Sequence, residues 1–281
     1  MKKLSIVVIF YNMQREAKRT LFSLSAKYQN VNKELYSVYA VDNGSLEPLD
    51  REFVESFGSN FHYIYYNTTS KSPVEAINST IKEINTPYIA CMIDGARIAS
   101  PNIINYSLDM LNLHKDPIVY TIGMHIGPDV QNISITKGYN KTVEDKLLES
   151  INWQENGYNL FDISSLALSS KEGFFSIPSE ANYFAMKKDS FINIGGYNEK
   201  FQYAGGGLCN LEFFKRASTT YTPICLLGEA TFHQIHGGVA TNAPMDKHPY
   251  KIMHKEYIDI VGDSYTIPEI KPLYYGKYRK I

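Results

Sequence analysis

Strand patterns alternate with helix patterns through the first hundred residues of the chain. The run Leu4–Phe10 is continuously apolar and rich in β-branched residues, which is typical of a strand buried on both faces. We expect further strands at 36–41, 61–66 and 88–93, and helices at 15–27, 51–57 and 73–84. Parallel neighbours in a sheet need crossover connections, which are usually helices. The series therefore predicts a mostly parallel sheet with helices on both faces.

The pattern is less regular beyond residue 100. The sequence predicts strands at 118–126, 182–186 and 224–232, and helices at 143–153, 188–194 and 210–217. Residues 159–173 are expected to form a polar loop. From residue 246 onward the chain is rich in Lys and Tyr and shows no clear periodicity.

Composition excludes several classes of protein. The 28 basic and 29 acidic residues leave a net charge of -1, which argues against a nucleic-acid binder that acts through a basic surface. No stretch approaches the roughly 20 apolar residues of a membrane span. The start of the chain mimics a signal peptide, but its apolar run is short and lacks a cleavage site, so a first strand explains it better. The three cysteines show no CxxC spacing, so we expect reduced thiols.

Polar side chains follow three of the predicted strands. Tyr11 and Asn12 follow the first strand, Asp42 and Asn43 the second, and Asp94 the fourth. Ligands of open α/β sheets bind outside the carboxyl ends of the strands, so these side chains could form one site. The alternative is structural, because turns after strands are commonly polar.

Four stretches share their order and spacing with one known family. They are SIVVIFYN at 5–12 with TLFSL at 20–24, VDNGS at 41–45, ANYFAMKK at 181–188 with GGYNE at 195–199, and GGGLCNLE at 205–212 with Arg216 and the later His233. This combination resembles glycosyltransferase family 2. The resemblance implies an α/β fold of the GT-A type, a Rossmann-like nucleotide-sugar-binding fold with a mostly parallel central sheet flanked by helices. The GT-A domain would span 1–245, with a nucleotide-sugar-binding half at 1–100, an acceptor half at 101–245, and a C-terminal tail at 246–281.

The resemblance implies a nucleotide-sugar donor bound at the ends of the first strands. Asp42 can accept a hydrogen bond from the edge of the base, or it can instead cap the loop 43–45 as an Asx-turn. Lys71 and Asn78 would also contact the donor, although a solvated lysine and a helix-surface amide are the ordinary alternatives. The implied donor-binding residues are Phe10, Tyr11, Asn12, Asp42, Asn43, Lys71, Asn78, Asp94, Gly95 and Arg97.

A divalent cation, Mg²⁺ or Mn²⁺, is the expected cofactor because the leaving diphosphate needs its charge neutralised. Members of the family usually carry Asp-x-Asp after the fourth strand, but here Ala96 stands at the second position. Asp94 and His233 would hold the cation weakly, with phosphate oxygens completing the shell. Arg97 could pair with phosphate, or form a surface salt bridge instead. For Asp94 the alternative is a turn residue at the end of the strand.

An acceptor hydroxyl must lose its proton to a base. The resemblance places an acidic pair at the start of the helix after the glycines, where this chain has Cys209 and Asn210. Glu212, the nearest carboxylate, is the expected base, with Asn210 positioning the hydroxyl; alternatively Glu212 is a first-turn acid stabilised by the helix dipole. Acceptor contacts are expected from Trp153, Gly206, Gly207 and His236, although a core tryptophan and a packed histidine are the ordinary alternatives.

The expected activity is that of an inverting, hexosyltransferase-like glycosyltransferase. It would move a sugar from a nucleotide-diphosphate donor, with a UDP-sugar favoured, to a glycan or lipid-linked glycan acceptor in surface polysaccharide or lipopolysaccharide synthesis. We expect a cytoplasmic protein, with peripheral association at the inner face of the membrane. A nucleotidyltransferase is one alternative, but it would need a glycine-rich basic loop that residues 10–13 lack. A non-catalytic nucleotide- or glycan-binding module is the other, and Ala96 and Asn210 favour it.

Overall fold

The N-terminal half of the sheet has the predicted parallel order. A computed structural model describes residues 2–277. Strand β1 (Leu4–Phe10) lies between β2 (Tyr36–Asp42) and β4 (Tyr88–Met92), and β3 (Phe61–Tyr65) lies beyond β2. All three pairings are parallel. The carboxyl ends of β1, β2 and β4 therefore meet at one edge of the sheet, as expected.

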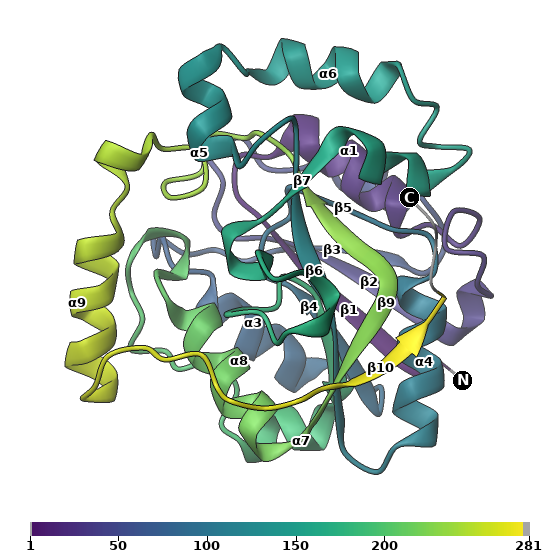
Figure 1. The fold of residues 1–281 in the computed structure, drawn as a ribbon. Helices are drawn as coiled ribbons and strands as arrows, with labels where there is room; N and C mark the ends of the chain where they lie inside the picture. The colour runs from purple at the N-terminus through teal and green to yellow at the C-terminus, as the bar shows by residue number, and fades with distance from the viewer. Residues whose placement is uncertain (1, 278–281) are drawn as a thin grey trace.

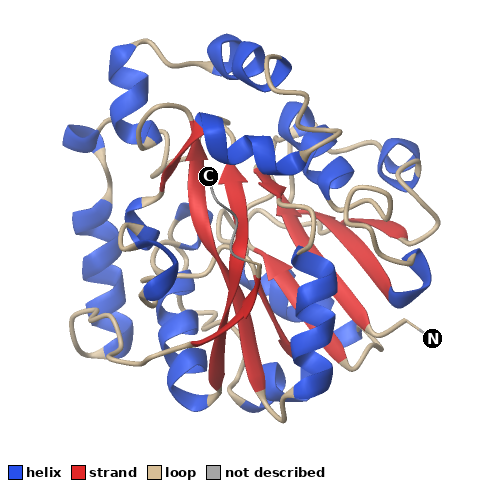
Figure 2. Cartoon of the chain, turned by 45° about the vertical axis from the view of Figure 1, so that its right-hand side comes forward, coloured by secondary structure: helices blue, strands red, loops and turns tan. Residues whose placement is uncertain are grey.

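The second half of the sheet mixes directions. Strand β8 (Phe184–Lys187) pairs antiparallel with both β4 and β6 (Pro117–Ile126), and β6 pairs parallel with β9 (Thr222–His233). Two short strands, β5 (Arg97–Ala99) and β7 (Ser164–Leu166), add antiparallel to β9 and β6. Figure 2 shows the strands as one twisted sheet with helices on both sides. The predicted α/β architecture with a mostly parallel central sheet is confirmed.

Alternate side chains of the buried strands face two helix layers. In β1, Leu4, Ile6 and Val8 pack in a cluster with residues of α1, α2 and α4, whereas Val7 and Ile9 pack with residues of α3, α7 and α8. This is the period-2 alternation of a strand covered on both faces. The helices of the first layer are α1 (Gln14–Ser23), α2 (Arg51–Glu55) and α4 (Ile103–Leu113), and those of the second are α3 (Val74–Glu83), α7 (Lys188–Asn193) and α8 (Cys209–Thr220). Two further helices, α5 (Gln131–Ser134) and α6 (Lys141–Glu149), lie near the top of the view in Figure 1.

The C-terminal region is more regular than the sequence suggested. The expectation of no pattern beyond residue 246 is wrong, because α9 (Tyr250–Val261) and β10 (Leu273–Gly276) form there. Met253 and Tyr257 of α9 are buried against the second helix layer, and β10 extends the sheet in parallel beside β9 (Figure 1). The exposed side of α9 also carries apolar residues, such as Ile252 and Ile258, which hides its helical period.

Two smaller expectations also need correction. The predicted loop 159–173 contains β7 and several 3₁₀ turns, and α1 ends four residues earlier than the predicted helix. None of the helices between residues 2 and 277 combines the length and the apolar character that a membrane span requires.

Candidate functional site

A cavity of about 670 Å³ opens at the carboxyl ends of β1, β2 and β4. Its other walls come from the segment leading into α8 and from the loop after β9. The predicted site residues that line it are Tyr11, Asn12, Asn43, Lys71, Asp94, Arg97, Gly207, Asn210 and His236. The structure therefore brings together side chains from distant parts of the sequence, as the strand-end argument predicts.

One end of the cavity is framed by the loops after β1 and β2. Tyr11 is 44% exposed, so its ring is available to a planar base. The Asn12 backbone N–H donates to Ser45 Oγ at 2.8 Å, and its side-chain Oδ1 accepts from the Leu46 backbone N–H at 3.1 Å. Asn12 has a φ of 52°, a left-handed conformation that asparagine tolerates well. These bonds fix the two loops relative to one another.

Asp42 does not face this cavity. Its Oδ1 accepts from the Ser45 backbone N–H and its Oδ2 from the Leu49 backbone N–H, both at 2.9 Å. The side chain is 1% exposed, so both oxygens are used in shaping the loop. The structure therefore supports the loop-capping alternative for Asp42, and its contact with a base stays a prediction. Phe10 and Gly95 pack against each other and are not among the residues that line the cavity: a Cβ on Gly95 would lie 2.4 Å from Cδ1 of the buried Phe10 ring.

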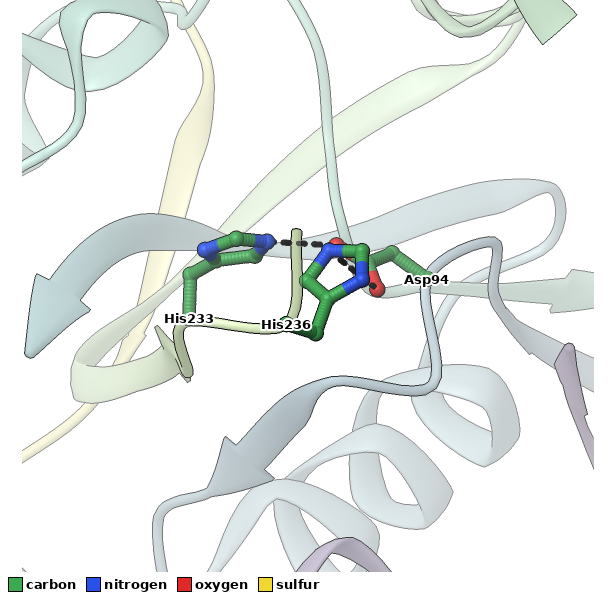
Figure 3. Close-up of side chains that lie close together, drawn as sticks. All are labelled: Asp94, His233 and His236. Carbon is green, nitrogen blue, oxygen red and sulfur yellow. Dashed lines mark ion pairs between the residues drawn. The ribbon is translucent and has the colours of Figure 1, made fainter. Parts of the chain in front are cut away.

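Asp94, His233 and His236 form a compact cluster beside the cavity (Figure 3). One ligand atom of each lies within 4.8 Å of the others. Asp94 Oδ2 is 2.9 Å from His233 Nε2, and Asp94 Oδ1 is 3.9 Å from His236 Nε2. Ala96 is fully buried in the hydrophobic core, so this position offers no ligand. The second histidine thus supplies a third donor where the second carboxylate is missing.

Hydrogen-bond direction fixes the protonation pattern of His233. Asn242 Oδ1 accepts from the backbone N–H groups of residues 236, 237 and 238, so its amide nitrogen is the group that faces Gln131. Gln131 Nε2 donates to the His233 carbonyl at 2.9 Å. Gln131 Oε1 is therefore the atom that accepts from Asn242 Nδ2 and from His233 Nδ1. His233 Nδ1, at 2.7 Å from that oxygen, must carry a proton.

A neutral His233 therefore presents a lone pair on Nε2 toward the carboxylate of Asp94. Burial lowers the pKa of His233 to about 4, against the opposing pull of Asp94. Two electron-pair donors 2.9 Å apart need a shared cation, because each repels the other without one. Carboxylate oxygen and imidazole nitrogen suit Mn²⁺ and other divalent ions. The donor set fits a divalent cation, and the Gln131 contact is the kind of supporting bond that orients a ligating histidine.

Arg97 is a buried residue of this cavity and not a surface ion pair. It lies opposite His233 in the β5–β9 register and is 4% exposed. Its Nε is 3.7 Å from Asp94 Oδ2, and its Nη1 has no hydrogen-bond partner within residues 2–277. The surface alternative is therefore wrong. A buried donor of this kind costs free energy unless a ligand oxygen satisfies it.

Glu212 lies outside the cavity. It makes a two-point ion pair with Arg216, with 2.7 Å to Nε and 2.8 Å to Nη2, and lines a separate hollow of about 540 Å³ together with Asn78. Residues 210 and 212 differ by about 200° around a helix of 3.6 residues per turn, so they face opposite ways. The assignments of Glu212 as the base and of Asn78 as a donor contact are therefore corrected.

Trp153 is a core residue. It is 2% exposed, and the rings of Phe22 and Tyr28 pack edge-on against it at 5.5 and 5.9 Å between centroids. No face is left for a sugar, so the stacking role is corrected. Gly206 is buried behind the cavity wall, where a Cβ would lie 2.6 Å from Cys209 Sγ.

Glu180 is a cavity residue that the sequence interpretation missed. It is partly buried, and its Oε2 accepts from Asn210 Nδ2 at 3.1 Å. Burial raises the pKa of Glu180, and Arg97 and Asn210 oppose this rise. Its only sequence signal is that it directly precedes the ANYF segment of the resemblance. His125 was missed as well; it lines the cavity, and burial holds its pKa well below the ordinary value.

Comparison with solved structures identifies the fold. The crystal structure of S. aureus TarS 1-349 matches with a TM-score of 0.54 at 14% identity, covering 94% of this chain and 67% of that chain. TarS 1-349 in complex with UDP-GlcNAc matches with a TM-score of 0.54 at 13% identity, covering 92% and 67%. A longer TarS structure matches with a TM-score of 0.53 at 13% identity, and this chain spans 40% of it. The fold is of the GT-A type.

The sequence match is confined to the N-terminal part. Residues 5–95 match the profile described as Glycosyl transferase family 2, which confirms the resemblance. This segment contains β1 to β4 and ends just after Asp94. This N-terminal third of the chain is therefore similar to glycosyl transferase family 2. No curated protein matches the chain in sequence.

Proposed function

We propose that the protein is a glycosyltransferase that uses a nucleotide-diphosphate sugar as its donor. The observation that carries this proposal is the Asp94–His233 pair, whose facing electron pairs call for a cation at the end of β4. The cation site adjoins a cavity with an aromatic, amide-rich nucleotide end. In this cavity a nucleoside diphosphate would place its base at Tyr11 and its phosphates at the cation.

The cation, when bound, would neutralise the charge that develops on the leaving diphosphate. Asp94, His233 and His236 would hold it, and Arg97 would add a donor to a phosphate or sugar oxygen. Buried donors that are already in place act without reorganisation at the moment of reaction. His236 and Arg97 would thereby replace the carboxylate that is missing at Ala96.

A UDP-sugar is the donor that we favour. Two of the neighbouring TarS structures are complexes with UDP and UDP-GlcNAc, which supports a uridine nucleotide for this chain. Transfer by direct displacement inverts the anomeric configuration, and we propose this outcome. A glycan or lipid-linked glycan acceptor, a role in surface polysaccharide synthesis, and a cytoplasmic, membrane-peripheral location rest on the family resemblance.

Calorimetric titration tests donor and cation together. We expect one of UDP, GDP, CDP and dTDP to bind, with an affinity at least tenfold higher in Mn²⁺ than in EDTA, because the phosphates and the protein share the cation. Asp94→Asn should abolish the effect of Mn²⁺, whereas the exposed control Asp162→Asn should not. Equal affinity with and without Mn²⁺ would disprove the cation role.

Product analysis separates the proposal from its two alternatives. A glycosyltransferase releases nucleoside diphosphate and free sugar when water is the acceptor, whereas a nucleotidyltransferase-type cleavage releases nucleoside monophosphate and sugar phosphate. A non-catalytic module binds the nucleotide and releases neither product. Ala96 and Asn210 keep this module as the second candidate function.

A further inference from the structure

We propose that Glu180 is the general base of the transfer, the group that takes the proton from the acceptor hydroxyl. The inference rests on the proposed function and names a residue for it. Glu180 belongs to the loop before β8 and not to the helix where the family resemblance placed an acidic pair. The observations that carry it are its place in the cavity, its bond to Asn210, and the state of the other titratable groups there.

Asn210 is oriented to hold a carboxylate and not a substrate. Its Oδ1 accepts from the Tyr197 hydroxyl at 3.1 Å, which leaves the amide nitrogen as the group facing Glu180. That nitrogen donates to Glu180 Oε2 and to the Ala181 carbonyl, both at 3.1 Å. An aspartate at position 210 would place a second negative charge against both acceptors. The amide at 210 and the carboxylate at 180 are thus complementary.

Arg97 links Glu180 to the cation site. Its guanidinium interacts electrostatically with both Glu180 and Asp94, and this interaction favours the charged form of each carboxyl group. Asp94 would therefore act on the leaving-group side and Glu180 on the acceptor side. The guanidinium of Arg97 interacts with both carboxylates. Burial raises the pKa of Glu180 and so makes it a stronger base than an exposed glutamate, while Arg97 and Asn210 oppose this rise.

The other candidate bases lining the cavity are already engaged. Asp94 and His233 face each other at the proposed cation site, and His236 Nε2 lies 3.9 Å from the same carboxylate. His125 Nδ1 accepts the Gln131 backbone N–H at 2.9 Å, and His248 Nδ1 accepts the Tyr250 backbone N–H at 3.1 Å, so the lone pair of each neutral ring is used. Among the described residues of the cavity wall, Glu180 is the remaining carboxylate.

The chemical step balances without a further reactant. The acceptor O–H bond breaks and its proton passes to the carboxylate of Glu180. The acceptor oxygen bonds to the anomeric carbon as the bond from that carbon to the diphosphate oxygen breaks. The electron pair of the broken bond leaves with the diphosphate, and Glu180 later returns its proton to solvent.

The decisive experiment compares Glu180→Gln with the exposed control Glu155→Gln. The probe is the nucleotide sugar that the wild type hydrolyses, with release of nucleoside diphosphate as the readout. We expect Glu180→Gln to lower kcat by roughly 10²–10⁴-fold, while the nucleotide affinity and its enhancement by Mn²⁺ stay within about threefold, because the side chain faces the acceptor. The control should match the wild type.

The outcomes keep the two proposals apart. If the wild type binds no nucleotide, the proposed function fails first. If the wild type turns over and Glu180→Gln keeps near-normal kcat, the base assignment is overturned and the donor site stands. If Glu180→Gln loses nucleotide affinity as strongly as kcat, Glu180 belongs to donor binding and the assignment is again overturned.

A pH profile gives a second measurement that does not need Glu180→Gln to fold. Turnover should fall as the pH drops through the raised pKa of Glu180, because a protonated carboxyl group cannot accept the proton. Asn210→Ala removes a donor that stabilises the ionised form, so it should move this acid limb to higher pH. An unmoved limb would overturn the assignment. Glu180 interacts electrostatically with five charged or titratable groups, which are Arg97, Asp94, Tyr197, Cys209 and Tyr265.

Discussion

Replacing Gln131 should weaken cation binding although its side chain lies behind the cluster and not in it. Gln131 Oε1 is 2.7 Å from His233 Nδ1 and 2.7 Å from Asn242 Nδ2, and its Nε2 donates to the His233 carbonyl. Gln131→Met keeps the volume and removes all three bonds. His233 is then free to take the other tautomer, with a proton facing Asp94 in place of the lone pair.

The size of the effect follows from these contacts. Removing a partner that orients a ligating histidine typically costs about 10–100-fold in metal affinity. The buried His233 carbonyl also loses the Gln131 hydrogen bond, so the free energy of unfolding should fall by roughly 1–3 kcal/mol. Mn²⁺ titration in the presence of the preferred nucleoside diphosphate measures the first quantity, and urea denaturation the second.

A second substitution isolates the acceptor role. Gln131→Glu keeps an oxygen that faces His233 Nδ1, so it should keep most of the Mn²⁺ affinity that Gln131→Met loses. The exposed Gln154→Met is the matched control. If folded Gln131→Met binds Mn²⁺ as the wild type does, the protonation argument for His233 is refuted.

Three further substitutions test the corrected assignments. Glu212→Gln should change kcat by less than about threefold and stability by about 0.3–0.5 kcal/mol, since it breaks only a partly exposed helix ion pair outside the cavity; kinetics and denaturation check both. Trp153→Ala should cost about 3–5 kcal/mol of stability with unchanged nucleotide affinity, because the ring is core packing; a specific loss of sugar transfer in a stable protein would contradict this. Asp42→Ala should destabilise the protein by roughly 2–6 kcal/mol by orphaning two buried backbone N–H groups, and denaturation that shows no loss would count against the loop role.

The first four strands were predictable from the sequence because each is a local pattern. Burial on both faces requires apolar side chains at every position of a strand, and Leu4–Phe10 shows this without reference to any other segment. The order of strands and helices then limits the topology to a few arrangements. Asp94 could be placed at the ligand edge by the same reasoning, since the carboxyl ends of parallel strands meet.

The helix α9 could not be predicted because its pattern is not local. Only Met253 and Tyr257 of its twelve residues are buried, and apolar side chains also lie on its exposed side. Which of them meets the core depends on where α8 lies, and no periodicity in the segment itself carries that information.

By itself, the sequence determined the α/β class, the mostly parallel sheet, the resemblance to a family that the comparison matches over 5–95, and the edge at which a ligand would bind. Only the tertiary structure decided which polar side chains remain free for chemistry. Asp42 and Glu212 were the expected carboxylates. Asp42 accepts hydrogen bonds from two backbone N–H groups, and Glu212 forms an ion pair with Arg216. Glu180 reaches the cavity because Asn210, thirty residues further along the chain, donates a hydrogen bond to it. The availability of a side chain depends on partners that are distant in sequence, and folding alone brings them together.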